Sequence, residues 1–191
     1  DRMDTLDARA EYLGMFDEVL NESDVVPLEA LRSVLELAEI IELKSGCFQV
    51  TDLGRDFMIE GNEGHLFIIL FVTWLREFNL AYSDNLPESP EFQNSLGYSL
   101  YRLSVFDDQW QNFQEVGEEL ILSSVAEAIP DKYPHYNLDI LEARFLRNLE
   151  LFGLVELKRE DSDEIPSIFM PVEAFRKTEL FSKFVGFGFE L

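Results

Sequence analysis

The sequence is short of basic residues and of the side chains that usually hold metals. Its 191 residues include 15 Lys plus Arg against 38 Asp plus Glu, a formal net charge of -23, with only 2 His and 1 Cys. A surface this acidic repels DNA phosphates and anionic lipid headgroups over most of its area. The acidity favours basic partners or cations, or it serves solubility alone, and all three interpretations stay open at this point.

The few metal-binding and nucleophilic side chains show no catalytic pattern. A single cysteine, Cys47, excludes an internal disulfide and a thiolate zinc cluster. His65 and His135 have no spacing to each other or to Cys47 that is typical of metal ligands, or of a nucleophile and its base. A phosphate-binding loop and a nucleophile elbow are also missing from the sequence. We therefore expect a noncatalytic protein with no metal and no organic cofactor.

Long apolar runs are missing as well. The most apolar run, Leu66 to Leu75, has ten residues, whereas a membrane span needs about 20. This run therefore predicts a buried helix, and we expect no membrane partner. The opening residues Asp1 to Asp4 do not resemble a signal peptide, so the expected location is the cytoplasm.

Helical periodicity dominates what is present. Apolar residues recur every three or four positions from Leu6 to Leu20, and again in a helix with Pro27 in its first turn. Two strand-like stretches flank a turn at Lys44-Ser45-Gly46, and a short helical turn follows from Thr51. Further helices are predicted for His65 to Tyr82, Pro90 to Phe106, Asp107 to before Pro130, and from a cap at Asn137 to Phe152.

The two ends of the chain carry similar sequence blocks. Leu35 to Lys44 aligns without a gap on Leu149 to Lys158, with six of ten positions identical. Downstream, a Thr-acid-Leu triplet and a Phe recur at the same spacing, as Thr51, Asp52, Leu53 and Phe57 and as Thr178, Glu179, Leu180 and Phe184. The second copy carries about thirteen extra residues from Arg159 onward. The pattern indicates a duplicated unit of helix, strand, turn, strand and short helix.

This unit resembles the wing of a winged-helix domain. The likeness rests on the two aliphatic residues Ile40-Ile41 after the helix, and on the hairpin that ends in Thr51-Asp52-Leu53-Gly54-Arg55, although the second copy lacks the glycine after Thr178. Through Phe78 to Tyr82 and Leu96 to Tyr101, the chain also resembles a family of uncharacterised bacterial proteins with such a paired arrangement. In some relatives a separate plasmid-encoded β-rich domain lies alongside. The resemblance implies a fold but names no activity.

We therefore expect a mainly α protein with small β-hairpins, an α+β class, in which two winged-helix-like units pack around a helical middle. The expected segments are 1–60 for the first copy, 61–130 for the helical middle, and 131–191 for the second copy with its longer wing. The function that we favour is a noncatalytic protein-interaction or regulatory module. The alternatives are a DNA-binding transcriptional regulator that uses the second copy, and an acidic DNA mimic. Duplex DNA is not an expected partner, and the oligomeric state stays open.

A basic cluster in the second copy is the candidate partner-binding surface. Spacings of three and four residues place several of its side chains on one side of a helix, and arginine is enriched at interface hot spots. The expected residues are Arg144, Arg147, Asn148, Leu151, Lys158 and Arg159. The alternative is that these arginines pair with Glu142, Glu150 and the acids of the wing. If these side chains form an exposed patch, replacing Arg144 and Arg147 with Glu should leave the stability of the protein nearly unchanged but abolish partner binding.

Overall fold

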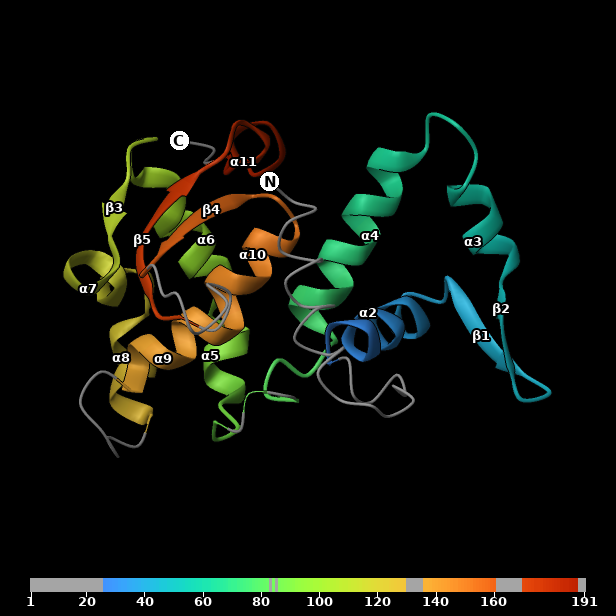
Figure 1. Cartoon of the computed structure of the whole chain (residues 1–191), viewed down its shortest axis with the longest axis horizontal. Helices are drawn as coiled ribbons and strands as arrows, with labels where there is room; N and C mark the ends of the chain where they lie inside the picture. The colour runs from blue at the N-terminus through green and yellow to red at the C-terminus, as the bar shows by residue number, and fades with distance from the viewer. Residues whose placement is uncertain (1–25, 83, 85, 130–135, 161–169, 189–191) are drawn as a thin grey trace. The chain divides into compact units, whose positions relative to one another are not determined.

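The computed structural model describes residues 26–82, 84, 86–129, 136–160 and 170–188, and the structural statements below concern these residues. Helices dominate, and two small antiparallel sheets accompany them (Figure 1), which confirms a mainly helical α+β chain. The described residues form two compact units, an N-terminal unit (26–82) and a C-terminal unit (84–188). The boundary falls within the span 61–130, where the sequence predicts a helical middle. The predicted helix from Leu6 to Leu20 and most of the longer second wing lie outside the described residues.

The N-terminal unit has a helix, a hairpin and two further helices. Its elements are α2 (Val26–Leu37), β1 (Ile41–Lys44), β2 (Cys47–Val50), α3 (Asp52–Phe57) and α4 (Glu63–Arg76). The hairpin turns through Ser45 and Gly46, both left-handed with φ of 53° and 79°, as the tight turn between two right-twisted strands requires. These elements confirm the helix around Pro27, both strands and the short helical turn.

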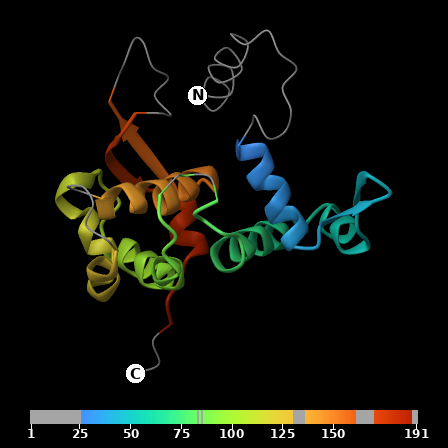
Figure 2. The same ribbon diagram turned by 90° about the horizontal axis from the view of Figure 1, so that it is seen from below.

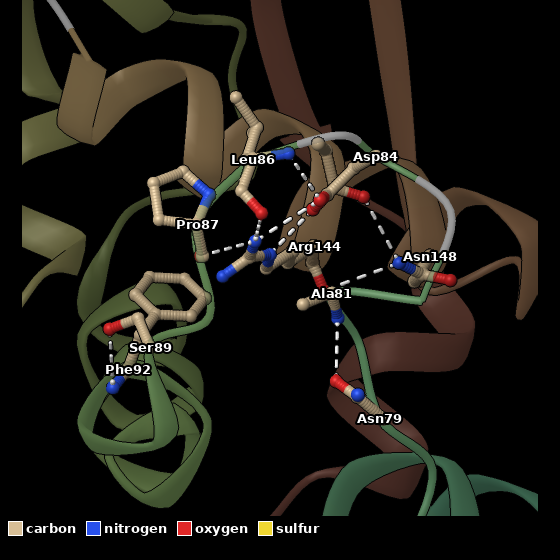
Figure 3. A network of polar contacts seen from close by, with 10 residues as sticks. Asn79, Ala81, Asp84, Leu86, Pro87, Ser89, Phe92, Arg144 and Asn148 are labelled. Carbon is tan, nitrogen blue, oxygen red and sulfur yellow. Dashed lines mark hydrogen bonds and ion pairs between the residues drawn. The ribbon is translucent and has the colours of Figure 1, made fainter.

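Helix α4 ends earlier than its apolar periodicity predicts. The prediction extended to Tyr82, but the helix stops at Arg76. Beyond it, the side-chain oxygen of Asn79 accepts a hydrogen bond from the backbone N–H of Ala81 at 3.0 Å (Figure 3). Such a local side-chain bond offers the backbone an alternative to the helix. The apolar residues Phe78 and Leu80 therefore lie in a turn after the helix, and their side chains are still buried.

The C-terminal unit contains the longer part of the described chain. Its elements are α5 (Pro90–Asn94), α6 (Leu96–Val105), β3 (Gln111–Asn112), α7 (Phe113–Val116), the 3-10 helix η2 (Gly117–Leu120), α8 (Ser123–Ala128), α9 (Tyr136–Leu141), the π-helix η3 (Glu142–Leu146), α10 (Arg147–Leu151), β4 (Val155–Arg159), β5 (Val172–Lys177) and α11 (Glu179–Phe184). Ser89 caps α5 as predicted, since its side chain accepts from the N–H of Phe92 at 3.4 Å with Pro90 at the helix start.

Two helix starts in this unit were predicted wrongly. No helix begins at Asp107-Asp108, because residues 111–112 form strand β3 and the helix starts only at Phe113. The side chain of Asn112 caps that helix, accepting from two backbone N–H groups at 3.0 and 3.3 Å. Asn137 lies inside α9 and does not cap it.

The three-stranded sheet of the C-terminal unit has the order β3-β5-β4, and all pairs are antiparallel. Strand β5 is therefore covered on both edges, with Phe175 opposite Leu157 on one side and opposite Gln111 on the other. Helix residues 136–151 contribute five side chains at 0% exposure to the core of this unit: Ile140, Leu141, Phe145, Leu146 and Leu149. Among the described residues, no helix is long and apolar enough to cross a membrane.

We expect the close packing of α3 against the hairpin to be the most sensitive backbone contact of the N-terminal unit. A Cβ atom at Gly54 would lie 2.3 Å from the Ile40 carbonyl oxygen and 2.8 Å from Cγ1 of Val50. Gly54→Ala should therefore lower the free energy of unfolding by about 1–3 kcal/mol, the usual cost of overpacking. Denaturant titration can follow Trp74 fluorescence in a Trp110→Phe background, because the chain has one tryptophan in each unit.

Gly64→Ala is the matched control. This glycine also lies near the start of a helix, but a Cβ there meets nothing within 4 Å. Its effect should stay within about 1 kcal/mol, the helix-propensity difference between the two residues. Equal effects of the two substitutions would contradict the packing explanation.

Candidate functional site

The helix-to-strand corners of the two units have the same local geometry. Glu39 and Gly153 occupy the turn after the helix, and both are left-handed, with φ of 57° and 70°. The next residue in each case donates a backbone hydrogen bond to the helix: Ile40 N to Leu35 O at 2.9 Å, and Leu154 N to Leu149 O at 2.8 Å. A glycine adopts this conformation freely, whereas the glutamate adopts it at a cost of about 1–2 kcal/mol.

A threonine closes each corner with matching contacts. Thr51 Oγ1 donates to Glu39 O at 2.7 Å, and Thr178 Oγ1 donates to Gly153 O at 2.8 Å. Each hydroxyl also accepts from the N–H three residues ahead and so caps α3 or α11. The strand register matches too, because Ile41 pairs with Val50 and Val155 with Lys177 at the same distance from the threonine. Residues 35–44 and 47–57 therefore correspond in position to 149–158 and 174–184.

The two hairpins differ in what covers them. In the C-terminal unit, β3 lies against β5, and Phe175 is fully buried beside the rings of Phe106 and Phe113, at centroid distances of 6.1 and 6.4 Å. The corresponding residue in the N-terminal unit is Phe48, which is 45% exposed, and its cross-strand partner Leu43 is 61% exposed. Within the described part of the chain, no strand pairs with the outer edge of β2.

An acidic depression of about 530 Å³ lies at the base of this hairpin. Its lining residues are Glu36, Glu39, Ile41, Glu42, Thr51, Asp52 and Leu53. Three of the four carboxylates pair with basic residues close in sequence: Glu36 with Arg32 at 2.5 Å, Glu42 with Lys44 at 2.9 Å, and Asp52 with Arg55 at 2.5 Å. The fourth, Glu39, has no hydrogen bond or ion pair of its side chain to any described residue.

This depression is not arranged as a metal centre. The described residues contain no group of three or more His, Cys, Asp or Glu placed to hold a metal ion. The exposed hairpin face and the depression share Ile41, so an apolar surface and an acidic one adjoin at the same place. We take the hairpin and the depression together as the candidate site, a surface suited to recognition.

Arg144 does not belong to an exposed patch, contrary to the surface predicted from the sequence. It is 2% exposed, and its guanidinium holds Asp84 through Nε at 2.5 Å and through Nη2 at 3.1 Å (Figure 3). The same Nη2 donates to the carbonyl oxygens of Leu86 at 3.1 Å and Pro87 at 2.8 Å. All of its strong acceptors lie within the C-terminal unit, so Arg144 fastens the segment around Pro87 to the helix.

Most of the remaining predicted residues are also paired within the C-terminal unit. Arg147 pairs with Glu142, with Nε 2.9 Å from Oε1, and Asn148 donates to the backbone oxygens of Ala143 and Arg144. Arg159 pairs with Glu150 at 3.0 Å, and Lys158 pairs with Glu173 at 3.4 Å on the exposed side of the sheet. Leu151 is 72% exposed. For Arg147 and Arg159 the structure therefore has the pairing with Glu142 and Glu150 that was the alternative to a binding surface, whereas Arg144 pairs with Asp84.

The sequence missed Phe48, Leu43 and the depression as site residues. Their only sequence signal is the alternation in the hairpin, where Ile41, Leu43, Phe48 and Val50 point to one face, and alternation does not reveal whether that face is covered. Comparison of the chain with protein-family models, curated proteins and solved structures found no match.

The contacts of Arg144 predict a large loss of stability on its removal. Arg144→Met leaves the Asp84 carboxylate, itself only 11% exposed, without its counter-charge, and breaking a buried pair costs about 3–5 kcal/mol. Lys158→Met is the matched control, since it breaks an exposed pair with an expected cost below about 1 kcal/mol. Denaturant unfolding of the full chain measures both. An Arg144 variant as stable as the Lys158 variant would show that the buried pair does not hold this segment.

Proposed function

We propose that this chain is a noncatalytic protein-interaction module built from two winged-helix-like segments, with its binding surface on the N-terminal unit. The observation that carries the proposal is the uneven distribution of exposed apolar side chains. Of the 17 large hydrophobic residues that are exposed in the described chain, 11 lie in the N-terminal unit, although it is the smaller of the two. Concentrated apolar exposure is typical of protein-binding surfaces.

The winged-helix part of the proposal is supported by topology. In the C-terminal unit, helix α6, strand β3, helices α7 and α8, helix residues 136–151 and the hairpin β4–β5 follow one another, with the early strand β3 beside the last strand β5. This is the order of helices and strands that a winged helix has. The matching corner contacts and register of α2, β1 and β2 support a duplicated origin for the two segments.

Recognition of duplex DNA by the second segment is disfavoured by the burial of its helix. A helix that enters the major groove needs basic or amide side chains on an exposed face. Between 136 and 151, only Asp139 and Leu151 are exposed, and the arginines of this helix are committed to Asp84 and Glu142. Helix α2 presents Glu29 and Glu36 around its single arginine.

We expect no micromolar binding of random-sequence duplex DNA near physiological salt. The net charge of -23 and the buried helix remove the phosphate contacts on which nonspecific binding depends. Fluorescence anisotropy of labelled duplex measures DNA binding. In parallel, selection from a library of random linear peptides tests for peptide binding, and we expect it to yield binders. DNA binding without peptide binders would overturn the proposed function. Peptide binders displaced by basic DNA-binding proteins would favour the DNA-mimic alternative.

A further inference from the structure

We propose that the outer edge of β2 receives an extended segment of a partner polypeptide, which adds a strand there as β3 does to β5. A large apolar side chain of that segment packs against Phe48 and Leu43, and flanking Lys or Arg residues face the acidic depression. This inference rests on the proposed function and assigns it a surface and a class of partner. The C-terminal unit provides the template, because the same hairpin is present there in its completed form.

The backbone of β2 is oriented to accept another strand. Thr51 N donates to Ile40 O at 3.0 Å, and hydrogen-bonded pairs alternate along an antiparallel ladder. With the register Ile41 to Val50, this alternation directs the N–H and C=O groups of Phe48 and Val50 away from β1. The C=O of Val50 accepts from Arg55 Nη1 at 2.7 Å, so Phe48 presents the open pair of backbone groups. In the C-terminal unit, the corresponding Phe175 turns its backbone toward β3 and lies opposite Gln111. Figure 1 shows β3 beside β5, whereas β1 and β2 form a sheet by themselves.

Among the described residues, the Arg32 guanidinium lies 5.4 Å from the centre of the Phe48 ring, but no third strand covers this hairpin as β3 covers its counterpart. Phe175 and Leu157 pair across the second hairpin, and Phe175 is fully buried under Phe113, the residue that directly follows β3. The equivalent pair Phe48 and Leu43 is exposed, and both views show the hairpin extending away from α4 (Figures 1 and 2). A strand followed by a large apolar residue would supply both missing contacts, and strand addition is a recurrent mode of peptide recognition.

The negative charge around the hairpin favours a partner segment with basic residues on either side of its strand. In the C-terminal unit, Glu150 and Glu156 are paired by Arg159 and Arg176, which reach them from within the hairpin. The corresponding hairpin positions in the N-terminal unit are Ser45 and Gln49, so Glu36 and Glu42 rely on half-exposed or exposed local pairs, and Glu39 has none among the described residues. Such pairs are worth little and exchange readily.

The same charge argues against a second copy of this chain as the occupant. Residues 26–82 carry nine Asp and Glu against four Lys and Arg. Two such units placed edge to edge would bring like charges together, which costs free energy at an interface. A foreign segment with basic flanks gains from the same field, and the field also raises its association rate.

Synthetic peptides can test the docking site directly. The probe is the sequence Lys-Gln-Trp-Gln-Asn-Phe-Gln-Lys, which copies the residues around β3 and replaces the flanking acids by lysine; one control has Glu at both ends and another has Pro in place of the central Asn. With the full chain, we expect saturable binding of the probe, at least tenfold weaker binding of both controls, and amide shifts in two-dimensional NMR spectra concentrated at Phe48, Gln49 and Val50.

Protein variants locate the site. Phe48→Asp should weaken probe binding at least tenfold without changing the unfolding midpoint, since the side chain is half exposed. Val105→Asp, at a residue that is 59% exposed in the other unit, should leave binding unchanged. Binding that survives Phe48→Asp, or shifts centred away from β2, would overturn this site. Library-selected peptides that bind elsewhere on the N-terminal unit would still leave the proposed function standing. A dimer in sedimentation experiments that Phe48→Asp dissociates would assign the edge to a second copy and overturn the proposal.

Discussion

A threonine-closed corner sets the path of the chain in both units. The hydroxyl of Thr51 or Thr178 bridges the left-handed turn after one helix and the first turn of the next. The buried residues Ile40 and Leu154, which begin the hairpins, accept the backbone N–H of the same threonines at 3.0 and 3.1 Å. Because strand register follows from how a hairpin is closed, this corner also decides which side chains share a face.

The corner is the same in both units, but the surroundings of the hairpin are not. In the C-terminal unit, β3 and the rings of Phe106 and Phe113 complete the sheet and bury Phe175. In the described part of the N-terminal unit, the sheet stops at two strands. An isolated two-stranded sheet is marginal in water, and an open edge is a template for pairing with another chain. The difference between the two hairpins therefore carries the functional argument.

The ion pairs of the C-terminal unit show why helical spacing in the sequence did not predict which of its basic residues are exposed. Arg144, Arg147 and Asn148 lie at helical spacings, yet each is engaged within the unit. The π-helical turn from Glu142 to Leu146 shifts the helical register by a residue, and Asp84 approaches from 60 positions away in sequence. A buried arginine requires such partners because desolvation of an unpaired charge costs several kcal/mol.

The sequence by itself determined the local structure. Proline in the first turn of α2, the Ser89-Pro90 start of α5, the Ser45-Gly46 turn and the Thr51 cap act through neighbouring backbone groups, so their effects are visible in the order of residues. Only the tertiary structure decided which polar side chains are buried and which apolar ones are left open. The strand that covers Phe175 comes from residues 111–112, and the acid that neutralises Arg144 is Asp84. Contacts across such distances depend on how the elements pack together, which local residue patterns do not specify.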